Sequence, residues 1–219
     1  AVAIDDVKRF IAQKDLDSKT RYIPKKVIPS NRGEFKNKIA IIGGGPAGLS
    51  CAYYLALTGY RPIVFEKNEK PGGMLTYGIP SYKLEKDVVE AEIDIIRALG
   101  VEIKCGVEVG KDITLDELRK DGYEAFYIAI GCQGSRKSGV DGEDADGVKS
   151  AVDILHEIAE NHDLDLKGNK TVVIGGGNVA VDVARSTKRC GADILGMFCL
   201  ESREEMPASE EEIFETEDE

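Results

Sequence analysis

Short apolar runs alternate along this chain with stretches whose apolar residues recur at helical spacing. Apolar runs at residues 38–42 and 61–65 flank a stretch rich in small residues, and the run at 171–174 is followed by a similar stretch. The order strand, helix, strand predicts parallel βαβ units and therefore an α/β fold with two Rossmann-like dinucleotide-binding units. Further helices are expected over residues 4–13, 85–99, 114–119, 148–161 and 179–190, and further strands over residues 101–109, 123–131 and up to Glu201.

The first unit, residues 38–66, carries a glycine fingerprint between its strand and its helix. Gly43 allows a tight turn, Gly45 lets backbone N–H groups approach a pyrophosphate, and Gly48 lets the helix lie close to the strand. The N-terminus of the helix adds oriented donors and partial positive charge. Glu66 follows Gly43 by 23 positions, where a carboxylate would accept hydrogen bonds from an adenosine ribose. The unit is therefore predicted to bind a dinucleotide.

A second fingerprint follows the strand at 171–174. Gly175, Gly177 and Ala180 occupy its three places, and the next strand is expected to end at Glu201. Two fingerprints in one chain indicate two nucleotides, one for each unit.

The part of the chain that follows the second fingerprint is short. Only 18 residues follow Glu201, fewer than the roughly 30 that another βαβ unit occupies. Together with Ala1 in place of a Met, this leads us to expect a piece of a longer protein or a designed chain. We predict an N-terminal helix and connector at 1–36, a first nucleotide domain at 37–150 and an incomplete second one at 151–219. The connector contains Pro24, Pro29 and Gly33.

Two other segments could touch a cofactor. The glycines and Pro80 within residues 72–80 predict an irregular loop, which could lie against a flat ring system or simply cover the surface. Ile130 and Gly131 end a predicted buried strand, and ligands in doubly wound folds sit at the carboxyl ends of strands. We interpret the next residue, Cys132, as a small packed side chain rather than a reactive thiol.

Charge and cysteines limit the class of partner. The formal net charge is -11, and the last 19 residues hold ten acids against one Arg, which argues against nucleic acid. The basic N-terminal arm is read as solvated rather than as a site for an acidic partner. Five scattered cysteines form no CxxC pair, which predicts a reducing compartment and no metal site or iron–sulfur cluster within this chain. Because no apolar run reaches about 20 residues, we expect no membrane span and a cytoplasmic location.

Several longer motifs resemble one family, the FAD-carrying small subunit of glutamate synthase and related NAD(P)H flavoproteins. The resemblance covers nearly the whole chain and is carried by GGGPAGLSCAYYLALTG, FEKNEKPGGMLTYGIPSYKL, YIAIG, VVIGGGNVAVDVARSTKRCGA and EEMPASEEEI. The PGGMLTYGIPSYKL stretch is far more specific than either glycine fingerprint.

The resemblance implies FAD in the first unit and a nicotinamide nucleotide in the second. The FAD contacts it implies are Gly43, Gly45, Pro46, Ala47, Gly48, Glu66, Gly73, Met74, Leu75, Val109, Ile130 and Gly131. Those for the nicotinamide nucleotide are Gly175, Gly177, Asn178, Val179 and Ala180. Val109 is expected to contact the adenine region from the end of its strand.

The chain departs from this family in two places. Many relatives carry Tyr-Arg-Arg at the end of the second nucleotide strand, where this chain has Cys199, Leu200 and Glu201. A carboxylate would repel the 2′-phosphate of NADP(H), so we predict that the second unit prefers NAD(H) to NADP(H). Alternatively, Glu201 is only the start of the acidic tail. The segment that returns to the FAD domain in relatives and their iron–sulfur cysteines are missing, so we expect an inactive piece of the enzyme.

For the intact protein we predict hydride transfer from NADH to FAD, followed by electron transfer to an iron–sulfur domain or subunit. The cofactors supply this chemistry, and no catalytic side chain is predicted. His156 and His162 are read as surface residues. The alternative is a non-catalytic dinucleotide-binding or subunit-interaction module. A short-chain dehydrogenase is disfavoured because it would leave one fingerprint unexplained.

Overall fold

The computed structural model describes residues 2–28, 30–31, 33–135, 137, 139–161 and 164–219. Pro29 of the connector and His162, interpreted above as a surface residue, lie outside the described residues. Contacts within the chain divide it into two compact units. The first contains residues 1–76 and 84–131, and the second contains residues 77–83 and 132–219. The domain limits expected after residues 36 and 150 stay predictions.

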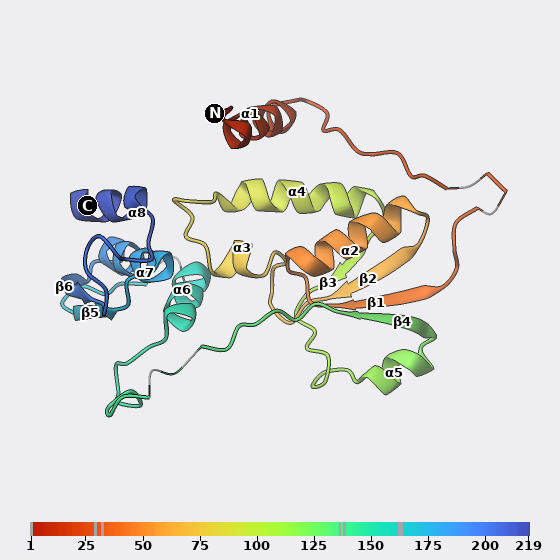
Figure 1. Ribbon diagram of the computed structural model, residues 1–219. Coiled ribbons are helices and arrows are strands. Elements are labelled where there is room, and N and C mark those ends of the chain that lie inside the picture. The colour runs from red at the N-terminus through yellow and green to blue at the C-terminus, as the bar shows by residue number, and fades with distance from the viewer. Residues whose placement is uncertain (1, 29, 32, 136, 138, 162–163) are drawn as a thin grey trace. The chain divides into compact units, whose positions relative to one another are not determined.

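The first unit is built on a four-stranded parallel sheet with the order β3-β2-β1-β4 (Figure 1). Ile42, at the end of β1, pairs in register with Phe65 on one side and Ile128 on the other, so these three strands end at one level. This confirms the predicted α/β class. The strands are β1 (Lys38–Ile42), β2 (Arg61–Phe65), β3 (Glu102–Lys104) and β4 (Tyr123–Ile128).

Helices cover both faces of this sheet. One core cluster joins buried Ala52 of α2 (Pro46–Leu57) to Ile41 and Val64, and Ile96 of α4 (Lys86–Ala98) packs against it. Another cluster joins Leu118 of α5 (Leu115–Lys120) to Ala40 and Phe65. Because alternate residues of a strand point to opposite faces, adjacent Ala40 and Ile41 belong to different clusters. The sheet therefore has a core on each side.

Helix α1 (Ile4–Leu16) forms where the sequence predicts a helix. In the described part of the chain it buries no residue, and Ile4, Val7 and Phe10 are each at least half exposed. The connector after it does lie on the first unit. The backbone N–H of Val27 donates to the carbonyl of Leu57, and the ring of Phe35 stacks on Tyr60 with centroids 4.2 Å apart.

Three elements predicted between residues 72 and 131 differ from the structure. The strand expected over residues 101–109 ends at Lys104, because the glycine at position 106 adopts φ +70° and turns the chain. Val109 forms only an isolated bridge with Ile113. The strand expected to be buried, β4, lies at the edge of the sheet, and its Ile128 is 64% exposed. Within the expected irregular loop, one helical turn forms as α3 (Met74–Tyr77).

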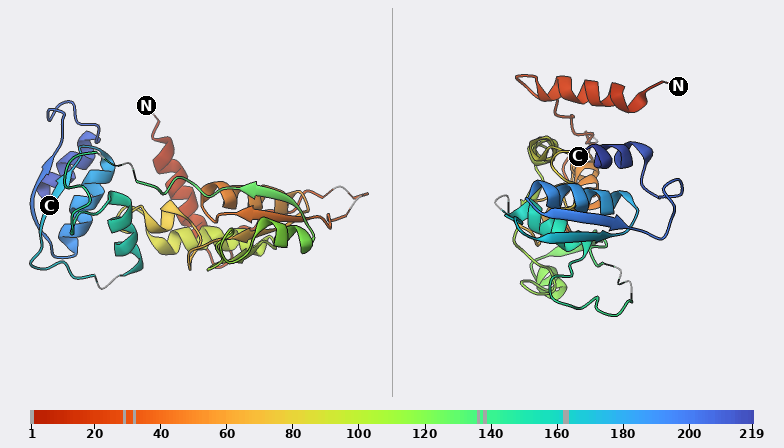
Figure 2. Two further views of the ribbon diagram at one scale, coloured as in Figure 1. Left: turned by 90° about the horizontal axis from the view of Figure 1, so that it is seen from below. Right: turned by 90° about the vertical axis from the view of Figure 1, so that its left-hand side faces the viewer.

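The second unit contains a parallel pair of strands covered by two helices. In Figure 2 (right), α7 (Asn178–Arg189) lies along this pair. The core of this unit joins Leu155 of α6 (Ala151–Glu160), Val173 of β5 (Lys170–Ile174) and Val183 of α7. The other strand of the pair is β6 (Asp193–Phe198).

The acidic tail folds as helix α8 (Glu210–Asp218), an element that the sequence pattern did not predict. The Ser209 hydroxyl accepts a hydrogen bond from the N–H of Glu212 and so caps the helix, and Ile213 is buried against Val181. Cys132, expected to be packed, is exposed, because the chain leaves the edge of the sheet at this point. Among the described residues, no helix is long and apolar enough to cross a membrane.

Candidate functional site: two glycine turns

The first glycine turn joins β1 to α2. The N–H of Gly43 donates to the carbonyl of Phe65 at 2.8 Å, which continues the ladder between β1 and β2 into the turn. Gly43 has φ +107°, and a Cβ there would lie 2.3 Å from the carbonyl oxygen of Ala129. A Cβ on Gly48 would lie 1.9 Å from the carbonyl oxygen of Gly43. Both positions therefore require glycine for packing within the chain.

Gly45 has a different reason to be glycine. Its backbone is extended, with φ -79° and ψ -175°, which any residue can adopt. The nearest described atom to a Cβ at this position would be the Cα of Gly73, at 3.8 Å, an ordinary contact. The fold does not exclude a side chain here, so the absence of one leaves room for a ligand against the backbone at the start of α2. This space fits the pyrophosphate of a dinucleotide.

Glu66 follows β2 directly and is 5% exposed. One carboxylate oxygen accepts the N–H of Gly44 at 2.6 Å, and the other accepts the N–H of Asn68 at 2.9 Å. The carboxylate thus ties the glycine turn to the end of β2. Each oxygen has a further lone pair, so a ribose hydroxyl can still donate to it.

The glycine doublet after β2 packs on the same turn. The N–H of Gly72 donates to the carbonyl of Gly44 at 2.7 Å, and a Cβ on Gly73 would lie 2.9 Å from the Cα of Gly45. This packing brings Gly73 to the turn and leaves the next residue, Met74, partly exposed. The alternative of an ordinary surface loop does not fit this close packing.

The other residues predicted to contact FAD are distributed unevenly. The N–H of Ala129 donates to the carbonyl of Ile42, so Ile130 and Gly131 leave the sheet next to the first turn, and both are exposed. Val109 instead packs among the side chains around Phe65 on the α5 face of the sheet. Leu75 lines a groove described below.

The second glycine turn, between β5 and α7, repeats the first. The N–H of Gly175 donates to the carbonyl of Phe198 at 2.8 Å, as Gly43 does to Phe65. Gly175 has φ +139°, and Gly177 is extended at φ -93° and ψ 171°. Among the described residues, no atom lies within 4 Å of the place where a Cβ on Gly177 would stand. Here too, the turn leaves room for a ligand.

A later segment of the chain supports the second turn. The N–H of Ala208 donates to the carbonyl of Gly176 at 3.0 Å, and the N–H of Ser209 donates to the side-chain oxygen of Asn178 at 3.0 Å. Sequence reasoning missed Ala208 and Ser209 as neighbours of the site. The motif EEMPASEEEI, which carried part of the family resemblance, contains them and was the available signal.

The residue that corresponds to Glu66 in the second unit is Cys199 rather than Glu201. The strand β6 ends at Phe198, so Cys199 follows it directly and Glu201 lies two positions further on. A Cβ on Gly176 would lie 2.9 Å from the Cβ of Cys199 and 3.5 Å from a carboxylate oxygen of Glu201. The expectation that the strand ends at Glu201 is therefore wrong, although its carboxylate does lie beside the turn.

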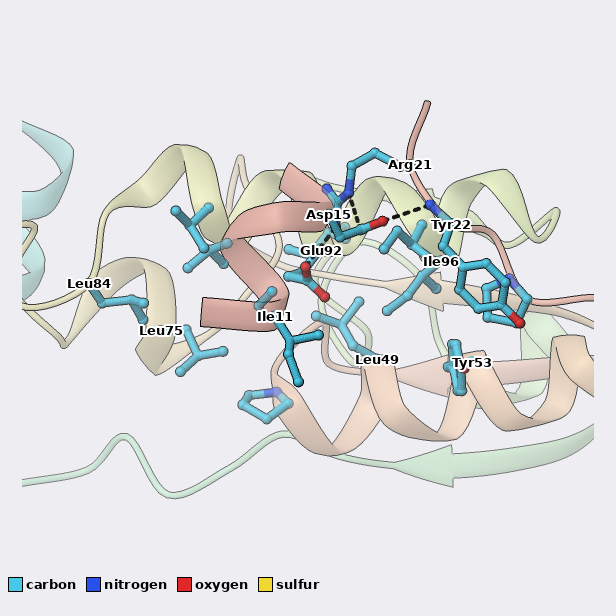
Figure 3. A pocket seen from close by; sticks show the side chains of 17 residues that line it. Ile11, Asp15, Arg21, Tyr22, Leu49, Tyr53, Leu75, Leu84, Glu92 and Ile96 are labelled. Carbon is cyan, nitrogen blue, oxygen red and sulfur yellow. Dashed lines mark hydrogen bonds and ion pairs between the residues drawn. The ribbon is translucent and has the colours of Figure 1, made fainter. Parts of the chain in front are cut away.

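A groove of about 900 Å³ lies in the first unit between α1, α2 and α4 (Figure 3). Its walls are mostly apolar, and Ile11 of α1 points toward α2, where Leu49 lies. At one rim, the guanidinium of Arg21 binds the carboxylate of Asp15 at 2.5 Å and that of Glu92 at 2.8 Å. The groove shares only Pro46 and Leu75 with the residues predicted to contact FAD.

These features define a Rossmann-like α/β protein with two dinucleotide-type glycine turns. The family model for pyridine nucleotide-disulphide oxidoreductases matches residues 37–214, and the chain belongs to this family. Glutamate synthase [NADPH] small chain from Escherichia coli is 36% identical over 225 residues, which cover 97% of this chain and 46% of that protein. The predicted family resemblance is thereby confirmed.

Two further comparisons agree. NADP(+)-dependent formate dehydrogenase subunit beta from Moorella thermoacetica is 46% identical over 182 residues, covering 82% of this chain and 26% of that protein. FprA from Mycobacterium tuberculosis, solved in complex with NADPH, has the same fold with a TM-score of 0.67 at 23% identity, covering 83% of this chain and 47% of FprA. The chain thus spans between a quarter and a half of these relatives.

Proposed function

We propose that the first unit binds FAD and the second binds a nicotinamide dinucleotide. The observation that carries this proposal is the repetition of one turn geometry, with ligand space at Gly45 and again at Gly177. The FAD contacts proposed are Gly43, Gly45, Pro46, Ala47, Gly48, Glu66, Gly73, Met74, Leu75, Val109, Ile130 and Gly131. The nicotinamide contacts proposed are Gly175, Gly177, Asn178, Val179 and Ala180, with Glu201 at the ribose.

The proposed reaction, in a longer protein, is hydride transfer from NADH to FAD with electrons passed on to an iron–sulfur domain or subunit. The two cofactors supply this redox chemistry when bound. The chain's own residues bind and orient them, through backbone N–H groups at the two helix N-termini and through the Glu66 carboxylate. The names of the relatives, a formate dehydrogenase subunit and a glutamate synthase chain, support a role within a larger assembly. We propose a cytoplasmic location and that the present chain alone does not turn over.

A preference for NADH is proposed against the names of the relatives, which specify NADP or NADPH. In this chain, Cys199, Leu200 and Glu201 follow β6, and none of them can pair with a 2′-phosphate. The next cation, Arg203, already binds Glu217 at 3.0 Å. A carboxylate beside the turn favours a free 2′-hydroxyl, which can donate to it.

The experiment that tests this function combines a spectrum with two titrations. The purified chain is mixed with FAD and desalted, and its visible absorption is recorded; retained flavin bands are expected. Calorimetric titrations with NADH and NADPH follow, and tighter binding of NADH is expected. A colourless protein that binds neither nucleotide would overturn the proposal, and tighter NADPH binding would overturn the NADH preference alone.

A second candidate, a subunit-interaction module without its own activity, is favoured by α1. Its apolar residues Ile4, Val7 and Phe10 are exposed together with several basic side chains of the same arm. A longer version of the chain distinguishes the two candidates. Bleaching of its flavin on anaerobic addition of NADH supports the enzyme, whereas binding of nucleotide without bleaching supports the module.

A further inference from the structure

Residues 77–83 group with the second unit by their contacts, although the residues on both sides of this segment belong to the first. At the start of the segment, the ring of Tyr77 stacks on the imidazole of His156 in α6, with centroids 4.6 Å apart and planes 12° apart. At its end, Tyr82 and Lys83 lie against α7 and α8. The predicted function gives no role to either residue.

Tyr82 lies under two cations of α7. Its ring centroid is 4.7 Å from the guanidinium carbon of Arg185 and 4.0 Å from that of Arg189. Burial raises the pKa of the Tyr82 hydroxyl, so the ring stays neutral and presents its negative face to the cations. Arg185 and Arg189 are four positions apart, which places them on one face of the helix.

Lys83 joins α7 to α8. Its ammonium lies 2.5 Å from a carboxylate oxygen of Asp182 in α7 and 2.5 Å from one of Glu212 in α8. All three side chains are more than three-quarters buried. Burial alone would lower the pKa of Lys83, but the hydrogen bonds to the two carboxylates outweigh it and raise that pKa. Lys83 therefore stays charged between the two helices.

Two arginines of α7 also bind α8. Arg185 lies 2.6 Å from Glu215 and 2.8 Å from Glu219, and Arg189 lies 2.6 Å from Glu219. With Lys83, three cations thus hold the acidic face of α8 against α7. This arrangement explains why the acidic tail is ordered as a helix rather than extended into solvent.

The position of α8 matters for the second glycine turn. The two residues just before α8 are Ala208 and Ser209, whose N–H groups donate to Gly176 and to the side chain of Asn178. If α8 separated from α7, these two hydrogen bonds would be lost with it. The position of residues 77–83 against α7 and α8 is thereby linked to the geometry of the second turn.

We propose that Tyr82 and Lys83 are positioning residues for the second nucleotide site, acting through α8. They hold α8 on α7, and α8 holds Ala208 and Ser209 on the turn. The identity of the nucleotide rests on the proposed function. Tyr82 follows Leu75, one of the proposed FAD contacts, by seven positions in the sequence.

The test uses the 219-residue chain and hydrogen–deuterium exchange followed by mass spectrometry. Tyr82→Ala and Lys83→Met are expected to speed exchange in residues 206–213 by about tenfold or more. The same variants should weaken NADH binding by roughly three- to tenfold and leave FAD affinity unchanged. Lys188→Met, on an exposed position of α7, is the matched control and should behave as wild type.

The conservative variant Tyr82→Phe keeps the ring and is expected to restore slow exchange. Unchanged exchange in residues 206–213 in both Tyr82→Ala and Lys83→Met would overturn the proposal. So would an equal acceleration in residues 151–174, because that would mean general unfolding of the unit. If Tyr82→Ala fails to fold, Lys83→Met alone decides. If wild type binds no NADH while exchange still responds, the proposed function fails and the support of α8 remains.

Discussion

The two glycine turns have the same backbone but are held in place by different parts of the chain. The first is closed by its own βαβ unit, since Glu66 at the end of β2 accepts the N–H of Gly44. The second has Cys199 at the corresponding place, and a later segment, through Ala208, binds Gly176. In both turns a later segment donates to the middle glycine, because the N–H of Gly72 binds the carbonyl of Gly44 as that of Ala208 binds Gly176. The difference is the Glu66 carboxylate, which ties the first turn to β2 and has no carboxylate counterpart directly after β6 in the second.

The helix also approaches the two turns differently. Gly48 of α2 leaves no room for a methyl group, whereas the corresponding Ala180 of α7 carries one. The sheets that carry the two turns also differ. The first turn belongs to a four-stranded sheet and the second to a two-stranded pair, so fewer strand contacts hold the second. The comparison teaches that a shared fingerprint fixes the path of a turn but not what stabilises it.

The largest expected effect comes from exchanging the helix residues of the two turns. Gly48→Ala would place a methyl group 1.9 Å from the carbonyl oxygen of Gly43, a residue that its N–H ties to β2. We therefore expect a loss of about 3 kcal/mol in unfolding free energy. Ala180→Gly should cost only about 1 kcal/mol, from helix propensity. Urea unfolding followed by circular dichroism measures both. Equal losses would contradict the difference between the turns.

The next effect separates ligand space from fold at the second turn. Gly177→Ala adds a methyl group where no described atom lies within 4 Å, so stability should change by less than about 0.5 kcal/mol. Affinity for NADH should fall by about tenfold or more, because the methyl group would occupy the space proposed for the pyrophosphate. Calorimetry provides the affinity and urea unfolding the control. An unchanged affinity would mean that Gly177 does not face the nucleotide.

These positions show what the sequence could and could not predict. Gly43, Gly48 and Gly175 stand between apolar runs in the order typical of a βαβ turn, so both turns and the α/β class were predictable. The end of β6 was not, because the apolar and polar residues from Phe198 to Glu201 continue without a break in pattern, and register with Ile174 decides it. The folding of the acidic tail as helix α8 could not be predicted either, because it depends on Arg185, which is distant in sequence.

A smaller effect is expected where the two strand ends differ. Glu201→Arg should lower the ratio of NADH to NADPH affinity by about tenfold, roughly 1.4 kcal/mol, because an arginine can pair with the 2′-phosphate that the carboxylate repels. Glu204→Arg, at an exposed position nearby, makes the same charge change and is the control. If both variants shift the ratio equally, the effect is one of general charge, and Glu201 is only the start of the acidic segment.

The smallest effect is expected at low pH in α8, the helix that supports the second turn. Hydrogen bonds from Arg189 and Arg185 hold the pKa of Glu219 below its ordinary value of 4.5. Because the pKa is depressed in the folded state, the pairing stabilises α8 above about pH 4.5 and is lost as the pH falls through the lower, folded-state value.

Hydrogen exchange in α8 should therefore speed up on going from about pH 7 to about pH 3.5, after correction for the intrinsic pH dependence of exchange. Glu219→Gln should show fast exchange already at neutral pH and a smaller acid response, with a difference worth roughly 1 kcal/mol or less. Glu210→Gln, in the exposed first turn of α8, is the matched control. The first glycine turn, which has no such helix to lose, should keep its exchange pattern in all three proteins, and a parallel change there would show that acid unfolds both units together.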